Sequence, residues 1–231
     1  MTLSTTLSRP TTLPRPARIG ALCLTAAAPL FLLANVVTAL GWRNPPFSWA
    51  THNISDLGNV HCGVWDTTRP RYVCSPWHPL MNASFVLTAL LLIVGFVLAW
   101  RLLCHGAAPR VAAWLFLLAA VGYALAGAYP ADVNENLHFL AALLILVLGN
   151  IGLPLAAFAP AGTVLGEIRP LTLVAAVVAL AGSVLFLTQQ PLGIGVGAME
   201  RVAAFPFLIW ASCVGVFLLV RSRTPRRVPV S

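Results

Sequence analysis

The side chains best suited to chemistry are polar or ionisable and lie at the edges of long apolar runs. The candidate catalytic residues are Asp56, His78, His138 and Glu200. The candidate substrate-binding residues are Ser55, Asn82, Asp132 and Arg201. Carboxylates and imidazoles commonly act as general acids and bases. Because ionisable groups close to hydrocarbon are costly, we predict that these residues form a functional site.

A zinc ion is one form that such a site could take. Two imidazoles and a carboxylate, with an open position for water, suit a catalytic zinc ion. We therefore hypothesise that His78, His138 and Asp56 bind zinc. No HExxH motif occurs, so the three ligands would have to converge from separate elements.

The same polar residues also have a purely structural interpretation. Asp132 and Asn134 could cap a helix that begins near them. Glu200 would lie in the first turn of the last helix, where the helix dipole favours an acid. Our first hypothesis is a lipid-related hydrolase or lipid-modifying protein that uses these residues as its site. The alternative is a non-catalytic scaffold or small-molecule binder in which they form a structural polar lock.

Asp56 illustrates both possibilities. Its carboxylate could serve a catalytic site, or it could pair with Arg43 or Arg201 and hold a loop against the helices. The neighbouring Ser55 lacks the G-x-S-x-G sequence that exposes a nucleophilic serine. Serine before aspartate is more typical of a turn or a helix cap.

The composition places these residues in a membrane protein. Of the 231 residues, 59% are hydrophobic and 9% are charged, whereas a soluble domain has about 25% charged residues. A net charge of +8 could indicate nucleic acid binding. However, all fourteen basic residues are Arg and they lie at the ends of apolar runs. We therefore expect membrane lipids as partners and no nucleic acid.

Six apolar runs are long enough to cross a bilayer, which takes about 20 residues. They cover approximately residues 19–42, 80–103, 111–129, 138–158, 171–187 and 202–220. The sequence predicts an all-α fold, a six-helix transmembrane bundle over residues 19–220. A disordered tail is expected at 1–18, a long extracytoplasmic loop at 42–79 and a basic tail at 221–231.

The distribution of Arg predicts the orientation. With the N-terminus in the cytoplasm, ten of the fourteen Arg residues lie on the cytoplasmic side. Only Arg43, Arg69, Arg71 and Arg201 lie on the other side, so both termini are expected to be cytoplasmic. The abundance of Ala, Leu, Val and Arg without Lys fits a GC-rich bacterial genome, so we expect the bacterial plasma membrane.

Two cysteines in the long loop, Cys62 and Cys74, could form a disulfide in an oxidising compartment. A zinc pair is the alternative, but the two residues lack the C-x2-C spacing of structural zinc sites. We predict the disulfide.

Four motifs at the loop ends resemble a known family. They are NISDLG (53–58), HPLMNASF (78–85), GAYPADVNENLH (127–138) and GAMER (197–201). In this order they resemble the membrane family called domain of unknown function 998, which implies a six-helix bundle and no established activity. The ISDLG element and the late histidine more distantly resemble the Frag, DRAM and Sfk group, which implies a role linked to lipids.

Overall fold

The computed structural model describes residues 13–65 and 69–222. Within these ranges, six helical segments are long and apolar enough to cross a membrane, which confirms the predicted number of spans. Five are single helices: α1 (Arg15–Gly41), α2 (His78–Leu103), α3 (Ala107–Ala128), α7 (Arg169–Leu187) and α8 (Val196–Arg221). The fourth consists of α4 (Glu135–Leu143), the π-helix η2 (Leu144–Gly149) and α5 (Asn150–Ala157). The chain is a multi-pass membrane protein.

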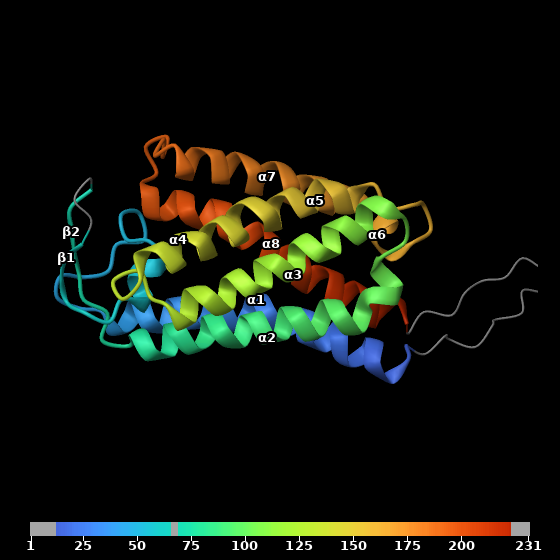
Figure 1. The fold of residues 1–231 in the computed structure, drawn as a ribbon, viewed down its shortest axis with the longest axis horizontal. Helices are drawn as coiled ribbons and strands as arrows, with labels where there is room; N and C mark the ends of the chain where they lie inside the picture. The colour runs from blue at the N-terminus through green and yellow to red at the C-terminus, as the bar shows by residue number, and fades with distance from the viewer. Residues whose placement is uncertain (1–12, 66–68, 223–231) are drawn as a thin grey trace, which may run out of the picture.

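The six spans lie side by side in one elongated bundle (Figure 1). Helix α1 packs against α2 and α8, α2 packs against α3, and the fourth span packs against α3 and α7. The loop between α1 and α2, the turn before α4 and the connection between α7 and α8 lie at one end of the bundle. We call this the loop end. The short helix α6 (Val164–Glu167) lies at the opposite end.

The long loop contains secondary structure that the all-α prediction did not include. A single 3-10 turn, η1 (Ser55–Gly58), is followed by strands β1 (Gly63–Trp65) and β2 (Arg71–Val73). The strands pair antiparallel, with Gly63 opposite Val73. The predicted disulfide between Cys62 and Cys74 is confirmed and lies directly outside this pair. It joins the two chain segments where the hairpin begins and ends.

All six spans begin two to six residues before the predicted runs, and two of these starts concern the candidate site. The fourth span starts at Glu135, because the Asn134 side chain accepts a hydrogen bond from the Leu137 N–H and so caps the helix. Helix α8 starts at Val196, so Glu200 lies inside the helix. The tails predicted at 1–18 and 221–231 fall largely outside the described residues; within these ranges, α1 begins at Arg15 and α8 ends at Arg221.

Buried aromatic side chains form the core away from the loop end. Phe96 and Phe116 stack at 5.2 Å between ring centroids, and Phe116 lies 5.3 Å from Phe207. The indole N–H of Trp210 donates to the Thr172 hydroxyl at 2.9 Å. These contacts connect α2, α3, α7 and α8 and satisfy the polar atom of the buried indole.

A polar cluster ties the fourth span to α7 and α8. Asn150 Nδ2 donates to Ser183 Oγ at 2.8 Å and to the Ala203 carbonyl at 2.9 Å. Ser183 Oγ in turn donates to the carbonyl of Leu146 in the π-helix at 2.9 Å. Pro206, inside α8, has no N–H to give to the preceding turn. The cluster therefore lies beside the π-helix of the fourth span and beside the turn of α8 in which Pro206 donates no hydrogen bond.

Candidate functional site

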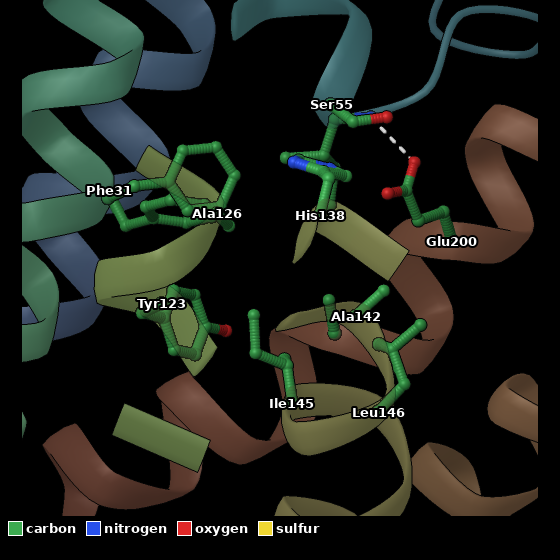
Figure 2. A pocket seen from close by; sticks show the side chains of 12 residues that line it. Phe31, Ser55, Tyr123, Ala126, His138, Ala142, Ile145, Leu146 and Glu200 are labelled. Atoms are coloured by element: carbon green, nitrogen blue, oxygen red, sulfur yellow. Dashed lines mark hydrogen bonds between the residues drawn. The ribbon is translucent and has the colours of Figure 1, made fainter. Parts of the chain in front are cut away.

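A small cavity lies beneath η1 at the loop end of the bundle (Figure 2). Its volume is about 40 Å³, room for about three water molecules at roughly 10–15 Å³ each. Most of the wall is apolar and includes Phe31 and Phe85. Four polar residues also line it, namely Ser55, Tyr123, His138 and Glu200. They come from η1, α3, α4 and α8, so the cavity brings together three of the predicted site residues.

Glu200 provides the one carboxylate of the cavity lining. Its Oε2 atom accepts a hydrogen bond from the Ile54 N–H at 2.6 Å (Figure 2). Within the described ranges, this is the only hydrogen bond of the carboxylate, and no Arg nitrogen forms an ion pair with it. The carboxylate therefore both anchors the loop and presents a second oxygen to the cavity.

His138 contributes an imidazole whose tautomer follows from its partner. Its Nδ1 atom lies 2.9 Å from the Tyr129 carbonyl oxygen. Because a carbonyl can only accept, Nδ1 carries the proton. In the neutral ring Nε2 is then a hydrogen-bond acceptor, the form in which an imidazole serves as a base.

Tyr123 is a cavity residue that the sequence interpretation missed. Its side chain is 1% exposed, and its hydroxyl has no hydrogen-bond partner among the described residues. Figure 2 shows the hydroxyl directed into the cavity from α3. Buried polar groups are nearly always hydrogen-bonded, so an unpaired one needs an explanation. The only signal in the sequence was a tyrosine, rather than phenylalanine, within an apolar run.

Asp56 is engaged in the loop and does not line the cavity. Arg71 binds both carboxylate oxygens through Nε and Nη2, each at 2.6 Å, and the Asn53 N–H donates to Oδ2 at 2.8 Å. The side chains of Asp56 and Arg71 are 1% and 9% exposed. The structural interpretation is supported, but the partner on strand β2 replaces the expected Arg43 or Arg201.

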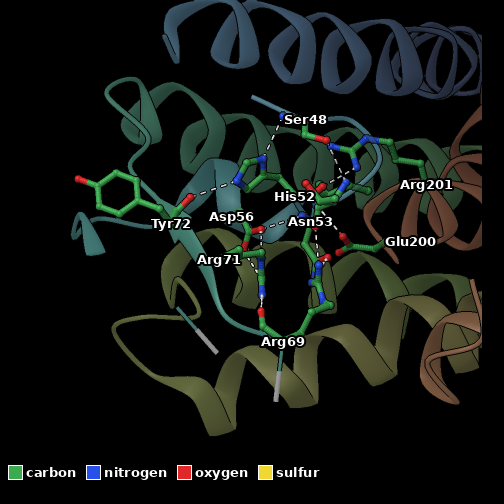
Figure 3. A network of polar contacts seen from close by, with 11 residues as sticks. Ser48, His52, Asn53, Asp56, Arg69, Arg71, Tyr72, Glu200 and Arg201 are labelled. Carbon is green, nitrogen blue, oxygen red and sulfur yellow. Dashed lines mark hydrogen bonds and ion pairs between the residues drawn. The ribbon is translucent and has the colours of Figure 1, made fainter. Parts of the chain in front are cut away.

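Arg201 clamps the loop onto α8 (Figure 3). Its Nη1 donates to the carbonyls of His52 at 2.9 Å and Gly197 at 2.6 Å, and its guanidinium lies 4.9 Å from the Trp49 ring centroid. The loop approaches the helix so closely that a Cβ on Gly197 would collide with the His52 carbonyl. Arg201 is therefore a structural residue of the loop attachment.

His52 is a further residue that the sequence interpretation missed. The Ser48 N–H donates to its Nδ1 at 3.0 Å, so Nε2 carries the proton and donates to the Tyr72 carbonyl at 3.1 Å (Figure 3). Its ring stacks on Phe47 at 5.2 Å. Both nitrogens are thus used to hold the first part of the loop against the hairpin.

The remaining predicted residues lie around the cavity but do not line it. Asn82 donates to the Gly58 carbonyl at 2.9 Å and holds the end of η1 against α2. Asp132 accepts from the His61 N–H at 2.7 Å. His78 is the first residue of α2 and is partly buried.

The zinc hypothesis finds no support in this geometry. In residues 13–65 and 69–222, no group of three or more His, Cys, Asp and Glu side chains is placed to hold a metal ion. Asp56 is already bound by Arg71, and of the three proposed ligands only His138 lines the cavity. The residues present do not fit the ion.

The cavity also lacks the contacts of a serine hydrolase. Such enzymes need a nucleophile hydrogen-bonded to a base that a third group orients. In the described part of the chain, Ser55, His138 and Glu200 share no hydrogen bond; His138 bonds to a carbonyl and Glu200 to a backbone N–H. The cavity therefore offers acceptors for binding but no activated nucleophile.

An apolar groove lies along α1 and α2. It has a volume of about 610 Å³ and runs along α1 from Pro29 to Val37 and along α2 from Leu80 to Leu87. Phe31 and Phe85, which line the cavity, belong to these same stretches and contact each other at 4.9 Å between ring centroids. The same two helix stretches thus supply side chains to both the cavity and the groove.

Comparisons with known proteins identify a family but no activity. Searches of curated proteins and of solved structures returned no match to this chain. The sequence model of the family described as "Protein of unknown function (DUF998)" matches residues 25–217. This range includes the long loop and all the residues that line the cavity. The family suggested by the four motifs is confirmed, and the chain belongs to the DUF998 family.

Proposed function

We propose that this protein binds a membrane lipid and takes the lipid's polar end into the cavity beneath Ile54 and Ser55. The observation that carries the proposal is the buried Tyr123 hydroxyl without a partner in the described residues, facing the same cavity as Glu200 and His138. Glu200 and His138 each have a backbone partner, but the Tyr123 hydroxyl has none in the described residues, and packing alone would not offset the desolvation cost of burying it.

Two features support a lipid rather than a water-soluble ligand. The cavity lies among the spans, bounded by residues of α1, α2, α3, the fourth span and α8. The apolar groove runs along the stretches of α1 and α2 that carry Phe31 and Phe85, and it offers a surface for an acyl chain. Ligand sites typically combine apolar walls with a few polar groups that fix orientation.

The proposal includes an orientation, with the loop end facing the extracytoplasmic side of a bacterial plasma membrane. The disulfide between Cys62 and Cys74 supports it, because disulfides persist in oxidising compartments and are rare in the cytoplasm. The Arg distribution in the sequence favours the same orientation.

Native mass spectrometry of the detergent-purified protein tests lipid binding. We expect one retained lipid per chain in the wild type and its loss in Ala142→Leu, which adds side-chain volume at the cavity wall. Ala128→Leu, at the exposed end of α3, is the matched control and keeps the lipid. Equal lipid retention in Ala142→Leu would contradict the proposal.

A structural polar lock is the second candidate, favoured by the hydrogen bond from Ile54 to Glu200 and by the Arg201 clamp. In that case Tyr123→Phe is neutral or stabilising, and no lipid is retained by either protein. Under lipid binding, Tyr123→Phe weakens lipid retention. The control Tyr129→Phe keeps the Tyr129 carbonyl that His138 uses, and lipid retention is unchanged.

A further inference from the structure

The ligand class of the cavity follows from the kinds of polar atom that line it. Glu200 offers one carboxylate oxygen beyond the oxygen that binds Ile54 N–H. His138 in its neutral form offers Nε2, because Nδ1 donates to the Tyr129 carbonyl. The Tyr123 hydroxyl has no partner in the described part of the chain and can accept as well as donate. Three acceptors therefore line one small space.

We propose that this cavity binds a primary ammonium group, either on a membrane lipid headgroup or on a free amine. A primary ammonium carries three N–H donors and one positive charge. It therefore matches the three acceptors, and it supplies a direct ion-pair partner for the Glu200 carboxylate, which forms no ion pair within residues 13–65 and 69–222. The lipid form of this inference rests on the proposed function; the free-amine form does not.

The aromatic wall supports a cation in preference to an anion or a neutral group. Phe31 lies 4.9 Å from Phe85 and 5.5 Å from Tyr123 between ring centroids, and all three rings line the cavity. Aromatic faces attract cations, most strongly where water is excluded. No lining residue is an Arg.

The hydrogen bonds of the two nearby Arg side chains go to partners other than Glu200. Arg71 binds both oxygens of Asp56, and Arg201 donates to the carbonyls of His52 and Gly197. Arg201 Nε and Nη2 have no hydrogen-bond partner among the described residues, and the charges of both Arg side chains act on Glu200 through space. Neither Arg lines the cavity, however, and Glu200 is the one acidic residue in its lining.

The size of the cavity selects among amines. About 40 Å³ accommodates roughly three water-sized groups, which suits an ammonium nitrogen with the first carbon atoms of its chain. A trimethylammonium group has four carbon substituents on nitrogen and no N–H to donate. We therefore expect ethanolamine-type ligands to bind and choline-type ligands to be rejected.

Thermal unfolding of the purified full-length protein tests the inference, because a ligand that binds the folded state raises Tm. The soluble probes are methylammonium, ethanolamine and choline chlorides, compared with sodium chloride at equal ionic strength. The lipid probes are nanodiscs of phosphatidylcholine alone or with added phosphatidylethanolamine or phosphatidylglycerol. We expect methylammonium, ethanolamine and phosphatidylethanolamine to raise Tm by about 2–4 °C, and choline to have no effect beyond that of sodium chloride.

The variant Glu200→Gln removes the charge but keeps an oxygen to accept from Ile54 N–H. It should abolish the response to amines. Glu135→Gln, an exposed carboxylate in the first turn of α4, is the matched control and keeps the response. If Glu200→Gln does not fold, Ala142→Leu serves in its place, because it reduces the cavity without altering a charge.

The outcomes separate this inference from the proposed function. Equal stabilisation by choline, or an amine response that survives both Glu200→Gln and Ala142→Leu, would overturn the ammonium site. Stabilisation by phosphatidylglycerol alone would retain lipid binding but refute the amine. A response to free amines without any response to phosphatidylethanolamine would support the ammonium site and refute the lipid. No response to any probe would mean that the cavity holds only water.

Discussion

The Glu200 carboxylate on α8 accepts a hydrogen bond from the backbone N–H of Ile54 at 2.6 Å, across 146 positions of sequence. This contact fixes the start of η1 directly over the cavity. One carboxylate oxygen of Glu200 thus holds the loop, while the same side chain lines the cavity. A change in what the cavity contains can therefore affect the position of the loop.

Removing the acceptor should loosen the loop. In Glu200→Ala, the Ile54 amide loses its partner, whereas in Glu200→Gln the side-chain carbonyl can still accept. We expect amide hydrogen exchange in residues 53–58 to accelerate at least about tenfold in Glu200→Ala, a loss of roughly 1.5–3 kcal/mol for a bond to a charged group. Glu200→Gln should stay close to the wild type; equal exchange rates in both variants would contradict this role.

The ion pair between Asp56 and Arg71 should be a major contributor to stability. Both side chains are nearly buried, and removing one partner of such a pair costs about 3–5 kcal/mol. We expect Asp56→Ala to lower Tm clearly, as measured by thermal unfolding in detergent. A double-mutant cycle with Arg71→Ala should show a coupling above about 0.5 kcal/mol, and strict additivity would mean that the pair contributes nothing.

Reduction of the disulfide should destabilise the loop end. The bond between Cys62 and Cys74 closes a short loop around the hairpin, for which a chain-entropy estimate gives about 2–4 kcal/mol. We expect Cys62→Ser to lower Tm and to abolish the further effect of a reducing agent. Cys23→Ser, which alters a free cysteine in α1, should retain the reductant response.

The polar cluster around Asn150 should stabilise the packing of three spans. Asn150→Leu removes the donors to Ser183 and the Ala203 carbonyl, and buried hydrogen bonds between membrane helices contribute about 0.6–2 kcal/mol. We expect a lower Tm, as measured by thermal unfolding in detergent. An exposed replacement in the same region, Ile151→Leu, is the control and should leave Tm unchanged.

The proposed orientation predicts the behaviour of reporter fusions. A fluorescent protein joined to the C-terminus should fold and fluoresce, because that end is expected in the cytoplasm. Alkaline phosphatase, which needs an oxidising compartment, should be inactive at the same position and active when inserted at Gly193 in the connection between α7 and α8. The reverse pattern of reporter activity would show that the loop end faces the cytoplasm and would contradict the proposed orientation.

The sequence predicted the number of spans, the loop and the disulfide because these depend on local composition and spacing. The sequence also predicted Asn134 as a possible helix cap, and the structure confirms this. The hairpin was missed because its three-residue strands are too short to show alternation. The apolar run predicts a start for the sixth span only after the polar residues Glu200 and Arg201, whereas in the structure the loop covers both and contacts Glu200 Oε2 and Arg201 Nη1, and α8 begins at Val196.

The candidate site was predicted only in part, for reasons of long-range geometry. Glu200 and His138 were identified because ionisable residues at span ends are conspicuous, and both line the cavity. The sequence alone does not show which Arg pairs with Asp56. Arg71 lies 15 residues further along the chain, and it reaches Asp56 only because the hairpin forms. Tyr123 was missed because a tyrosine in an apolar run reads as an ordinary core residue.

The π-helix makes the fourth span tolerant of a change in length at one place only. A π-turn holds one more residue than an α-turn, and each residue of an α-helix advances the next by about 100°. Deleting a single residue within Leu144–Gly149 would therefore restore regular α-helix and leave Asn150 facing Ser183. The same deletion in α4, after His138, would turn His138 by about 100° relative to Asn150, although every remaining side chain is still suited to the membrane.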